Sequence, residues 1–363
     1  MKILMINDSL KPSGGAEEVF LDEAAGLEKR GHQIILRDEQ NLHLGSFASE
    51  TFDLISLHNV FDPDLYEKLV SIAPTIHYVH DHRTYSVGSS RYHFRSNEIC
   101  TAPLGLTHNL SYAYLEKCAS RNLLKLITET FRKKRLLKIH NQLKKVIANS
   151  NYVKDQLVKN GVNKDLIEVV YPSRAEYRVE GQVTTDKPVV LFAGRLFVEK
   201  GAEYAIRAMQ KVGNAYLWIL GTGWDESRLK TMVKELNLET KVKFLGWLDK
   251  KEIGKIYEAA TVGVVPSIWP EPFGLSGTNF MSLGKPVVGF DSGGIKEWLT
   301  DGETGFLVKR LDVQSLASSI NTLLEDDTLR KKMGARAKAV FEEKFSLNVH
   351  LDKMEQIFSE VVK

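Results

Sequence analysis

The sequence predicts an α/β protein built from two parallel, doubly wound sheets, and three observations support this. Short apolar strands alternate with amphipathic helices along most of the 363 residues. The alternation is interrupted once, between residues 171 and 187, where Pro, Gly and polar residues gather without a helix. A chain of this length is also typical of two domains. We therefore expect two similar α/β domains that meet at this hinge.

The elements follow in order on each side of the hinge. Before it, the apolar runs predict strands over residues 2–6, 32–38, 52–59, 75–81 and 145–150. A turn is predicted over 7–16, and helices over 17–31, 64–72 and 151–161, the last capped by Ser150. After the hinge, strands are predicted over 189–194, 216–221, 242–248, 262–267 and 286–291, each followed by a helix.

The composition is that of a soluble globular protein. Hydrophobic residues make up 43% of the chain, charged residues 26%, and the net charge of +3 does not indicate a nucleic-acid partner. The first residues lack the long apolar core of a secretory signal, and no run of 18 apolar residues is present. Cys100 and Cys118 give no disulfide framework. We expect a cytoplasmic protein.

The sequence does not predict a metal site. Asp62 and Asp64 form an acid pair, but Asp64 begins the predicted helix over 64–72 and is better explained as a helix cap. Five histidines lie in the same region as the two cysteines, yet their spacings match no zinc-finger pattern. These are His77, His80, His82, His93 and His108.

Four glycine-bearing loops lie at the ends of predicted strands. They contain Gly14–Gly15, Gly194–Arg195, Gly221–Gly223 and Gly293–Gly294. Glycine lets a backbone approach a ligand closely, and the helix that follows offers free N–H groups to an anion. Tight strand-to-helix turns use glycine as well, so no single loop decides the matter.

The segment GRLFVEKG is more informative. Arg195 and Lys200 flank a loop that leads into a helix near Gly201, and two cations beside a helix N-terminus suit a diphosphate. The competing interpretation is a solvated loop in which they pair with Glu199 or Glu203. Neither a GxxxxGK loop nor a GxGxxG turn after the first strand is present, which disfavours nucleotide hydrolases and NAD enzymes.

Taken together, the motifs resemble a known family. They are GGAEEVF, the His80–Asp81 pair, VIANS, GRLFVEKG, GTG, VKFLGWL, EPFGLSGTNFMSLGKPVV and SGGIKEW, in this order. With them the chain resembles the retaining family-4 glycosyltransferases of the GT-B fold. The resemblance implies two Rossmann-like domains facing a nucleotide-sugar cleft, and a last helix that crosses back to the first domain. The expected domains are residues 1–170 plus 346–363, on the acceptor side, and residues 171–345, on the donor side.

The resemblance also implies roles for individual residues. Arg195 and Lys200 would bind the donor diphosphate, Glu271 would hold the sugar hydroxyls, and His80 would lie near the reactive face of the sugar. These four are the expected catalytic residues. No metal and no cofactor are expected, since the nucleotide-diphosphate sugar is itself the substrate. The expected donor-binding residues are Gly15, Gly194, Gly221, Gly223, Phe244, Leu245, Phe273, Gly274, Leu275 and Asn279.

Position 279 departs from the family pattern. The family places a second Glu eight residues after the first, where it binds the ribose, but here that residue is Asn279. The amide offers one neutral acceptor in place of a carboxylate. Donor binding is then weaker, or the ribose is held differently, or the chain is an inactive sugar-binding partner subunit. A same-fold nucleotide-sugar epimerase is a further alternative. We favour an active hexosyltransferase of cell-envelope polysaccharide or glycoconjugate synthesis.

Residues 121–146 are basic and apolar, with Glu129 as their only acid. Leu123, Ile127, Leu137 and Leu143 could form one face of a helix. A basic amphipathic helix suits an anionic membrane surface, and the alternative is a core-facing helix with a solvated basic side. We favour peripheral binding to the inner face of the membrane and a glycan or lipid-linked acceptor.

Overall fold

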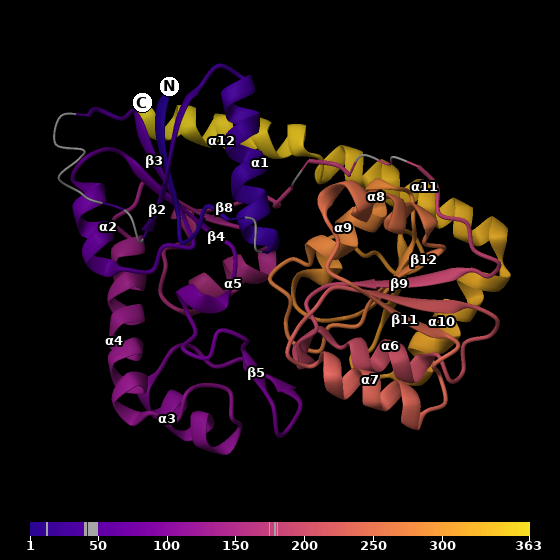
Figure 1. Cartoon of the computed structure of the whole chain (residues 1–363). Helices are drawn as coiled ribbons and strands as arrows, with labels where there is room; N and C mark the ends of the chain where they lie inside the picture. Colours follow the sequence, from indigo (N-terminus) through magenta and orange to yellow (C-terminus); the bar gives the residue numbers. More distant parts are fainter. Residues whose placement is uncertain (12–13, 40–41, 43–49, 174, 178, 180) are drawn as a thin grey trace. The chain divides into compact units, whose positions relative to one another are not determined.

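The computed structural model describes residues 1–11, 14–39, 42, 50–173, 175–177, 179 and 181–363 (Figure 1). The chain forms two compact units. Unit 1 comprises Met1–Ala175 with Ser346–Lys363, and unit 2 comprises Glu176–Phe345. Residues 12 and 13 of the turn predicted over 7–16, and residues 174, 178 and 180 of the predicted hinge, lie outside the described residues.

Unit 1 contains a six-stranded parallel sheet in the order β2-β1-β3-β4-β7-β8. Strands β1, β3 and β4 are almost entirely buried, as expected for parallel strands covered on both faces. The strands are β1 (Lys2–Asn7), β2 (Gln33–Asp38), β3 (Leu54–His58), β4 (Thr75–Val79), β7 (Lys145–Ala148) and β8 (Ile167–Val169).

Alternate residues of the strands point to two hydrophobic layers. Leu4 and Ile6 pack in one cluster with helices α2, α4 and α5, whereas Ile3 and Met5 pack in another with α1 and α12. The helices are α1 (Gly15–Lys29), α2 (Pro63–Val70), α3 (Leu106–Leu115), α4 (Leu123–His140), α5 (Asn151–Lys159) and α12 (Leu347–Val362), with short 3₁₀ turns η3 (His82–Thr84) and η4 (Lys164–Leu166).

Unit 2 repeats the architecture with a six-stranded parallel sheet in the order β11-β10-β9-β12-β13-β14. Its strands are β9 (Val189–Ala193), β10 (Tyr216–Leu220), β11 (Val242–Gly246), β12 (Val262–Val265), β13 (Val287–Phe290) and β14 (Gly305–Val308). Its helices are α6 (Ala202–Ala208), α7 (Glu226–Glu235), α8 (Lys250–Ala259), α9 (Leu275–Ser282), α10 (Val313–Glu325) and α11 (Asp327–Lys344), with 3₁₀ turns η5 (Val198–Lys200) and η6 (Gly294–Glu297).

The predicted fold class is confirmed, and several local predictions need correction. The cap of α2 is Asp62, which accepts a hydrogen bond from the Asp64 amide, because the helix begins one residue before Asp64 at Pro63. Ser150 caps α5 as predicted. The edge strand β14, the helix α3 and the antiparallel hairpin of β5 (Tyr92–His93) and β6 (Glu98–Ile99) were not predicted.

The basic stretch 121–146 is not one amphipathic helix. It contains α4, a turn and the start of β7, and the predicted apolar face divides between core and solvent. Leu137 and Leu143 are buried, whereas Leu123 is 53% exposed. In the part of the chain that the structure describes, no helix combines the length and apolarity needed to cross a bilayer.

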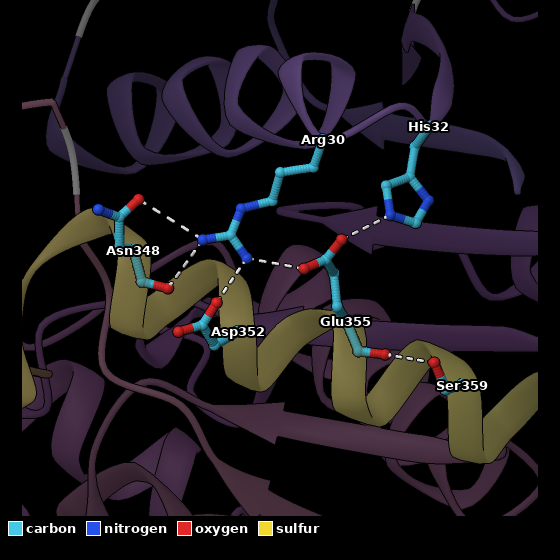
Figure 2. Close-up of polar contacts among 6 residues, drawn as sticks. All are labelled: Arg30, His32, Asn348, Asp352, Glu355 and Ser359. Atoms are coloured by element: carbon cyan, nitrogen blue, oxygen red, sulfur yellow. Dashed lines mark hydrogen bonds and ion pairs between the residues drawn. The ribbon is translucent and has the colours of Figure 1, made fainter.

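Polar contacts join the last helix, α12, to α1 (Figure 2). The Arg30 guanidinium donates to Asp352 Oδ1 at 2.6 Å and to Glu355 Oε2 at 2.7 Å, and His32 Nε2 lies 2.8 Å from Glu355 Oε1. These groups are partly exposed, so each pair contributes no more than about 1 kcal/mol to stability. They fix the direction of α12 rather than supply most of the stability.

A buried pair lies on the same two helices. His350 Nε2 is 2.9 Å from Glu23 Oε2, and both side chains are almost inaccessible to solvent. His350 Nδ1 also lies 2.8 Å from the Tyr171 carbonyl oxygen, so the imidazole contacts an oxygen on each side. Removing one partner of such a pair leaves the other buried without compensation.

Replacing His350 with Ala should therefore lower the free energy of unfolding by about 3–5 kcal/mol, because the Glu23 carboxylate loses its partner. Urea unfolding followed by fluorescence measures this. The double variant Glu23→Leu with His350→Leu should recover most of the loss, and Lys331→Ala, at an exposed ion pair on α11, should cost less than about 0.5 kcal/mol. Equal losses in His350→Ala and Lys331→Ala would contradict the proposed role of the pair.

Candidate functional site

A cluster of hydrogen-bonded polar groups lies in unit 2, at the carboxyl ends of two neighbouring strands. Strand β9 lies in the middle of the sheet, with β10 on one side and β12 on the other, so the order of connections reverses between β9 and β12. Ligands of open α/β sheets bind at such a switch point. Lys200 follows β9 and Glu271 follows β12, so both lie at this point.

Glu271 is the centre of the cluster and only 4% exposed. Its carboxylate accepts hydrogen bonds from Lys200 Nζ at 2.8 and 3.0 Å, and from Ser267 Oγ at 2.6 Å. The backbone is fixed too, since the Gly294 amide donates to the Glu271 carbonyl at 2.7 Å. The side chain is therefore held in one position before any ligand arrives.

Electrostatics keep Glu271 ionised. Burial acts to raise the pKa of its carboxyl, but the charge of Lys200 and the hydrogen bonds from Lys200 and Ser267 outweigh burial, so the pKa lies below its ordinary value. Lys200 Nζ also lies 4.8 Å from the centre of the Trp269 ring. The result is a buried carboxylate and a partly exposed ammonium group in direct contact.

Close backbone packing brings Lys200 to Glu271. Gly201, directly after Lys200, has a φ of +72°, and a Cβ atom there would lie 1.9 Å from the Pro266 carbonyl oxygen. The Ile268 amide donates to the Glu199 carbonyl at 2.9 Å. Only glycine fits this contact, which presses the loop after β9 against the loop after β12.

The glycine loop after β10 packs in the same way. Gly221 has a φ of +130°, and a Cβ atom there would lie 2.0 Å from the Gly194 carbonyl oxygen. A Cβ atom on Gly223 would lie 2.2 Å from the Leu196 carbonyl oxygen. Arg195 is exposed, with its guanidinium 4.9 Å from the Phe197 ring centre. The structure thus brings Lys200, but not Arg195, into contact with Glu271.

The remaining predicted residues of unit 2 lie at the same edge or beneath it. Phe244 and Leu245 are partly buried in β11, and Lys230 Nζ lies 5.5 Å from the Phe244 ring centre. Phe273 is buried, and its carbonyl accepts from Trp298 Nε1 at 2.8 Å. Gly274 adopts a φ of +97° just before Leu275 begins α9, and no side chain caps this helix.

Asn279 lies inside α9 and is 8% exposed. Its Nδ2 donates to the Tyr257 hydroxyl of α8 at 3.3 Å, and Tyr257 stacks on Tyr177 with ring centres 5.4 Å apart. A carboxylate at this position could also accept a hydrogen bond from the Tyr257 hydroxyl. The change to Asn therefore removes a charge without emptying the position.

His80 and Gly15 belong to unit 1. Gly15 begins α1 directly after the loop that follows β1, and His80 follows β4. His80 Nε2 is 2.9 Å from His58 Nδ1, and burial lowers the pKa of His80 to about 3. At neutral pH His80 is therefore an uncharged imidazole, which can exchange hydrogen bonds but cannot stabilise a negative charge with a full positive one.

Sequence reasoning missed three residues. Ser267 donates to Glu271, and Trp269 lies against Lys200; both follow β12, so their place at a strand end was the available signal. In unit 1, Asn59 follows β3 with a φ of +50° and is 1% exposed. Among the described residues, neither amide atom of Asn59 has a hydrogen-bond partner. A strained, buried and unsatisfied amide at a strand end is typical of a ligand site.

Unit 1 also has a cavity of about 380 Å³ beside α4. Arg83, Lys125, Arg132 and Lys133 line it, together with Glu129, so its walls are predominantly basic. Burial lowers the pKa of Lys133 to about 8, and Lys133 donates to the Arg83 carbonyl. A cavity of this size and charge can accept an anionic group with an apolar or sugar body.

Two family models divide the chain between them. The model described as Glycosyltransferase Family 4 matches residues 13–173, and that described as Glycosyl transferases group 1 matches residues 173–340. The chain belongs to these glycosyltransferases. The predicted resemblance to this family is thereby confirmed.

Individual relatives match only about half of this chain. An uncharacterised glycosyltransferase of Methanocaldococcus jannaschii is 33% identical over 205 residues, covering 55% of this chain and 52% of the relative. The lipopolysaccharide core biosynthesis glycosyltransferase LpsE of Rhizobium meliloti is 29% identical over 182 residues, covering 50% of this chain and 53% of LpsE. The matches span about half the length of these curated relatives.

The fold is similar to that of solved glycosyltransferases. The crystal structure of Anabaena HepE in complex with UDP has a TM-score of 0.72 and 21% identity, covering 99% of this chain and 100% of HepE. At this identity the likeness concerns the fold alone. It confirms the predicted GT-B architecture of two Rossmann-like halves.

The Gly201 contact gives a direct test of how the site is assembled. Gly201→Ala should lower the free energy of unfolding well beyond the roughly 1–2 kcal/mol expected for a left-handed alanine, because the new methyl group meets the Pro266 carbonyl. Gly302→Ala is the matched control, since Gly302 has a φ of +75° with nothing within 4 Å of an added Cβ. Urea unfolding of both variants makes the comparison, and equal losses would show that the close packing at Gly201 is unimportant.

Proposed function

We propose that this protein is a retaining, metal-independent hexosyltransferase that uses a nucleotide-diphosphate sugar. The observation that carries the proposal is the Lys200–Glu271 pair, held at the switch point of the second sheet among glycine loops whose backbones pack directly against one another. HepE, whose fold is similar, has been crystallised with UDP-glucose. A uridine diphosphate sugar is therefore the first donor to test.

The two charges of the pair suit opposite ends of the bond that breaks. Lys200, with the exposed Arg195, would bind the diphosphate and stabilise the negative charge that grows as it leaves. Glu271 would accept hydrogen bonds from the sugar hydroxyls and favour the positive charge developing on the ring. In the free protein the two groups neutralise each other, so donor binding would exchange one ion pair for two interactions with the substrate.

The proton of the acceptor hydroxyl also needs a destination. His80 is neutral at physiological pH, so it would orient a sugar hydroxyl rather than stabilise the leaving group. We propose that the acceptor attacks on the face from which the diphosphate departs and passes its proton to the leaving phosphate. The chain then needs no strong base, and the bond to the anomeric carbon forms with retained configuration.

The acceptor side of the proposal rests on unit 1. The basic cavity beside α4 suits an acceptor with a phosphate or other anionic group, and Asn59 offers an unsatisfied amide to a hydroxyl. LpsE of Rhizobium meliloti is named for lipopolysaccharide core biosynthesis. We propose an anionic or lipid-linked glycan acceptor of the cell envelope, and a role in polysaccharide or glycoconjugate synthesis.

A second function is kept because of Asn279, the position at which the family has an acid. The chain could bind a nucleotide sugar without turning it over, as a partner subunit of an active enzyme. The intact Lys200–Glu271 pair argues against this reading, since a chain released from catalysis would not need to keep a buried ion pair at the switch point. Donor binding without nucleotide release would favour it.

Turnover of the donor tests the proposed roles. Release of UDP from uridine diphosphate hexoses, measured with a cell-envelope lipid extract as acceptor, should fall by about 10²–10³-fold in Lys200→Ala and in Glu271→Ala, since each removes a preorganised charge. Lys331→Ala, at an exposed ion pair on α11, should leave the rate unchanged. Normal turnover in either site variant would refute the assignment.

A further variant addresses Asn279. If Asn279 takes the place of the ribose-binding acid, Asn279→Glu should strengthen UDP binding by about 1–2 kcal/mol, as measured by calorimetry. Unchanged or weaker binding would mean that the ribose is held elsewhere.

Membrane attachment is a separate part of the proposal. Five large apolar side chains are exposed at the end of α3 and on the first half of α4: Tyr114, Leu115, Leu123, Leu124 and Phe131, at 48–74% exposure. Exposed basic residues lie among them, including Lys117, Arg121 and Lys125. Apolar groups that insert and cations that meet lipid phosphates together suit an anionic bilayer surface. We propose that this patch, and not the whole stretch 121–146, meets the membrane.

Flotation with liposomes tests the patch. The protein should float with vesicles containing anionic lipid at low salt and less so as salt rises. Leu124→Asp with Phe131→Asp should abolish flotation, whereas Ile72→Asp, at an exposed apolar residue after α2, should not. Failure of the wild-type protein to float at low salt would rule out the membrane contact while leaving the donor site untouched.

A further inference from the structure

Three residues that are distant from the donor site share one small space in unit 1. His93 lies on β5, Cys100 directly follows β6, and His108 lies in the first turn of α3. One ligand atom from each lies within 4.8 Å of the other two. Cys100 Sγ is 3.2 Å from His108 Nε2. The sequence spacings did not predict this cluster, because a hairpin and a helix bring the residues together.

The cluster is enclosed and incompletely satisfied. His93 is 6% exposed and Cys100 is 7% exposed. Nε2 of His93 is buried and has no hydrogen-bond partner among the described residues. Leaving such a nitrogen unsatisfied costs about 1–3 kcal/mol, so a partner from outside the chain is expected. The ring cannot easily turn away, because Tyr112 stacks on both imidazoles, with ring centres 4.7 Å from His93 and 4.3 Å from His108.

The side chains have the chemistry of a transition-metal site. Two imidazoles and a thiolate suit Zn²⁺, whereas Mg²⁺ and Ca²⁺ prefer oxygen ligands. Zinc with bonds of about 2.1 Å to nitrogen and 2.3 Å to sulfur places its ligand atoms roughly 3.3–3.7 Å apart. The three atoms of the cluster therefore need to move by no more than about 1 Å to reach this geometry.

The surrounding structure would gain from such a bond. The β5–β6 hairpin has only two residues in each strand, and a hairpin of that size is not stable in water by itself. The three ligands come from the hairpin region and from α3, so one ion would join these two parts of the chain. Metal binding in such a place contributes directly to folding free energy.

We propose that His93, Cys100 and His108 bind one Zn²⁺ ion, which fastens the β5–β6 hairpin to α3. Binding releases the thiol proton of Cys100 to solvent, and a water molecule completes the tetrahedral coordination. The role is structural and independent of the donor site, so it stands or falls separately from the glycosyltransferase activity. Cys118, the second free cysteine, lies outside the group of three and is not a ligand.

Metal analysis of the full-length protein, prepared without a histidine tag, is the direct test. The wild-type protein should retain about one equivalent of zinc after dialysis, and its Co²⁺ form should show a thiolate-to-cobalt charge-transfer band. Cys100→Ser and His108→Gln should lose the zinc and the band. Cys118→Ser is the matched control and should keep both.

Thermal stability provides a second measurement, in addition to the metal content of the variants. A strong chelator should lower the Tm of the wild-type protein and of Cys118→Ser, and should leave the Tm of Cys100→Ser unchanged, since that variant has no ion to lose. If the Cys100→Ser variant fails to fold, the cobalt spectrum and the chelator response of the wild-type protein still decide. Wild-type protein that takes up no zinc, zinc retained by Cys100→Ser, or zinc lost from Cys118→Ser would each overturn the proposal.

Discussion

The buried carboxylate of Glu271 is the constraint on which the second unit's site depends. A charge with 4% exposure is stable only when it is paired and hydrogen-bonded, and here Lys200 and Ser267 fulfil both requirements. This need for a paired carboxylate fixes the positions of the loops after β9 and β12 relative to each other. Because these strands are neighbours at the point where the order of connections reverses, one local pairing also defines the place where a ligand can enter.

Glycine makes this arrangement geometrically attainable. At Gly201, Gly221 and Gly223 a side chain would overlap a neighbouring carbonyl oxygen, so the backbones of adjacent loops pack directly against one another. The loops then present peptide groups and two cations at one edge without large side chains between them. In unit 1 the corresponding edge is built differently, from buried polar side chains such as Asn59 and His80.

Much of this could be predicted from the sequence, for reasons that differ between the parts. Apolar runs such as residues 2–6 and 189–194 could be predicted as strands because both faces of those strands are buried. The sequence could predict only that Lys200 and Glu271 lie near each other. The two residues are 71 positions apart, and no sequence pattern indicates their direct contact. Ser267 and Asn59 were missed because polar residues at strand ends are common. A single sequence does not distinguish one that has a functional role from one that belongs to an ordinary turn. The prediction of one amphipathic helix over residues 121–146 was wrong because the spacing of apolar residues alone does not tell which neighbouring elements cover a helix.

The position of α12 has a consequence for how the chain is made. Leu351, Met354 and Phe358 fill the same apolar cluster as Ile3 and Phe20, so one face of the first sheet, on which α1 also packs, is incompletely covered until α12 has left the ribosome. The second unit, whose own residues are contiguous, can complete its core earlier. Of the two units, the one whose sheet is synthesised earlier is thus the one whose core is completed later.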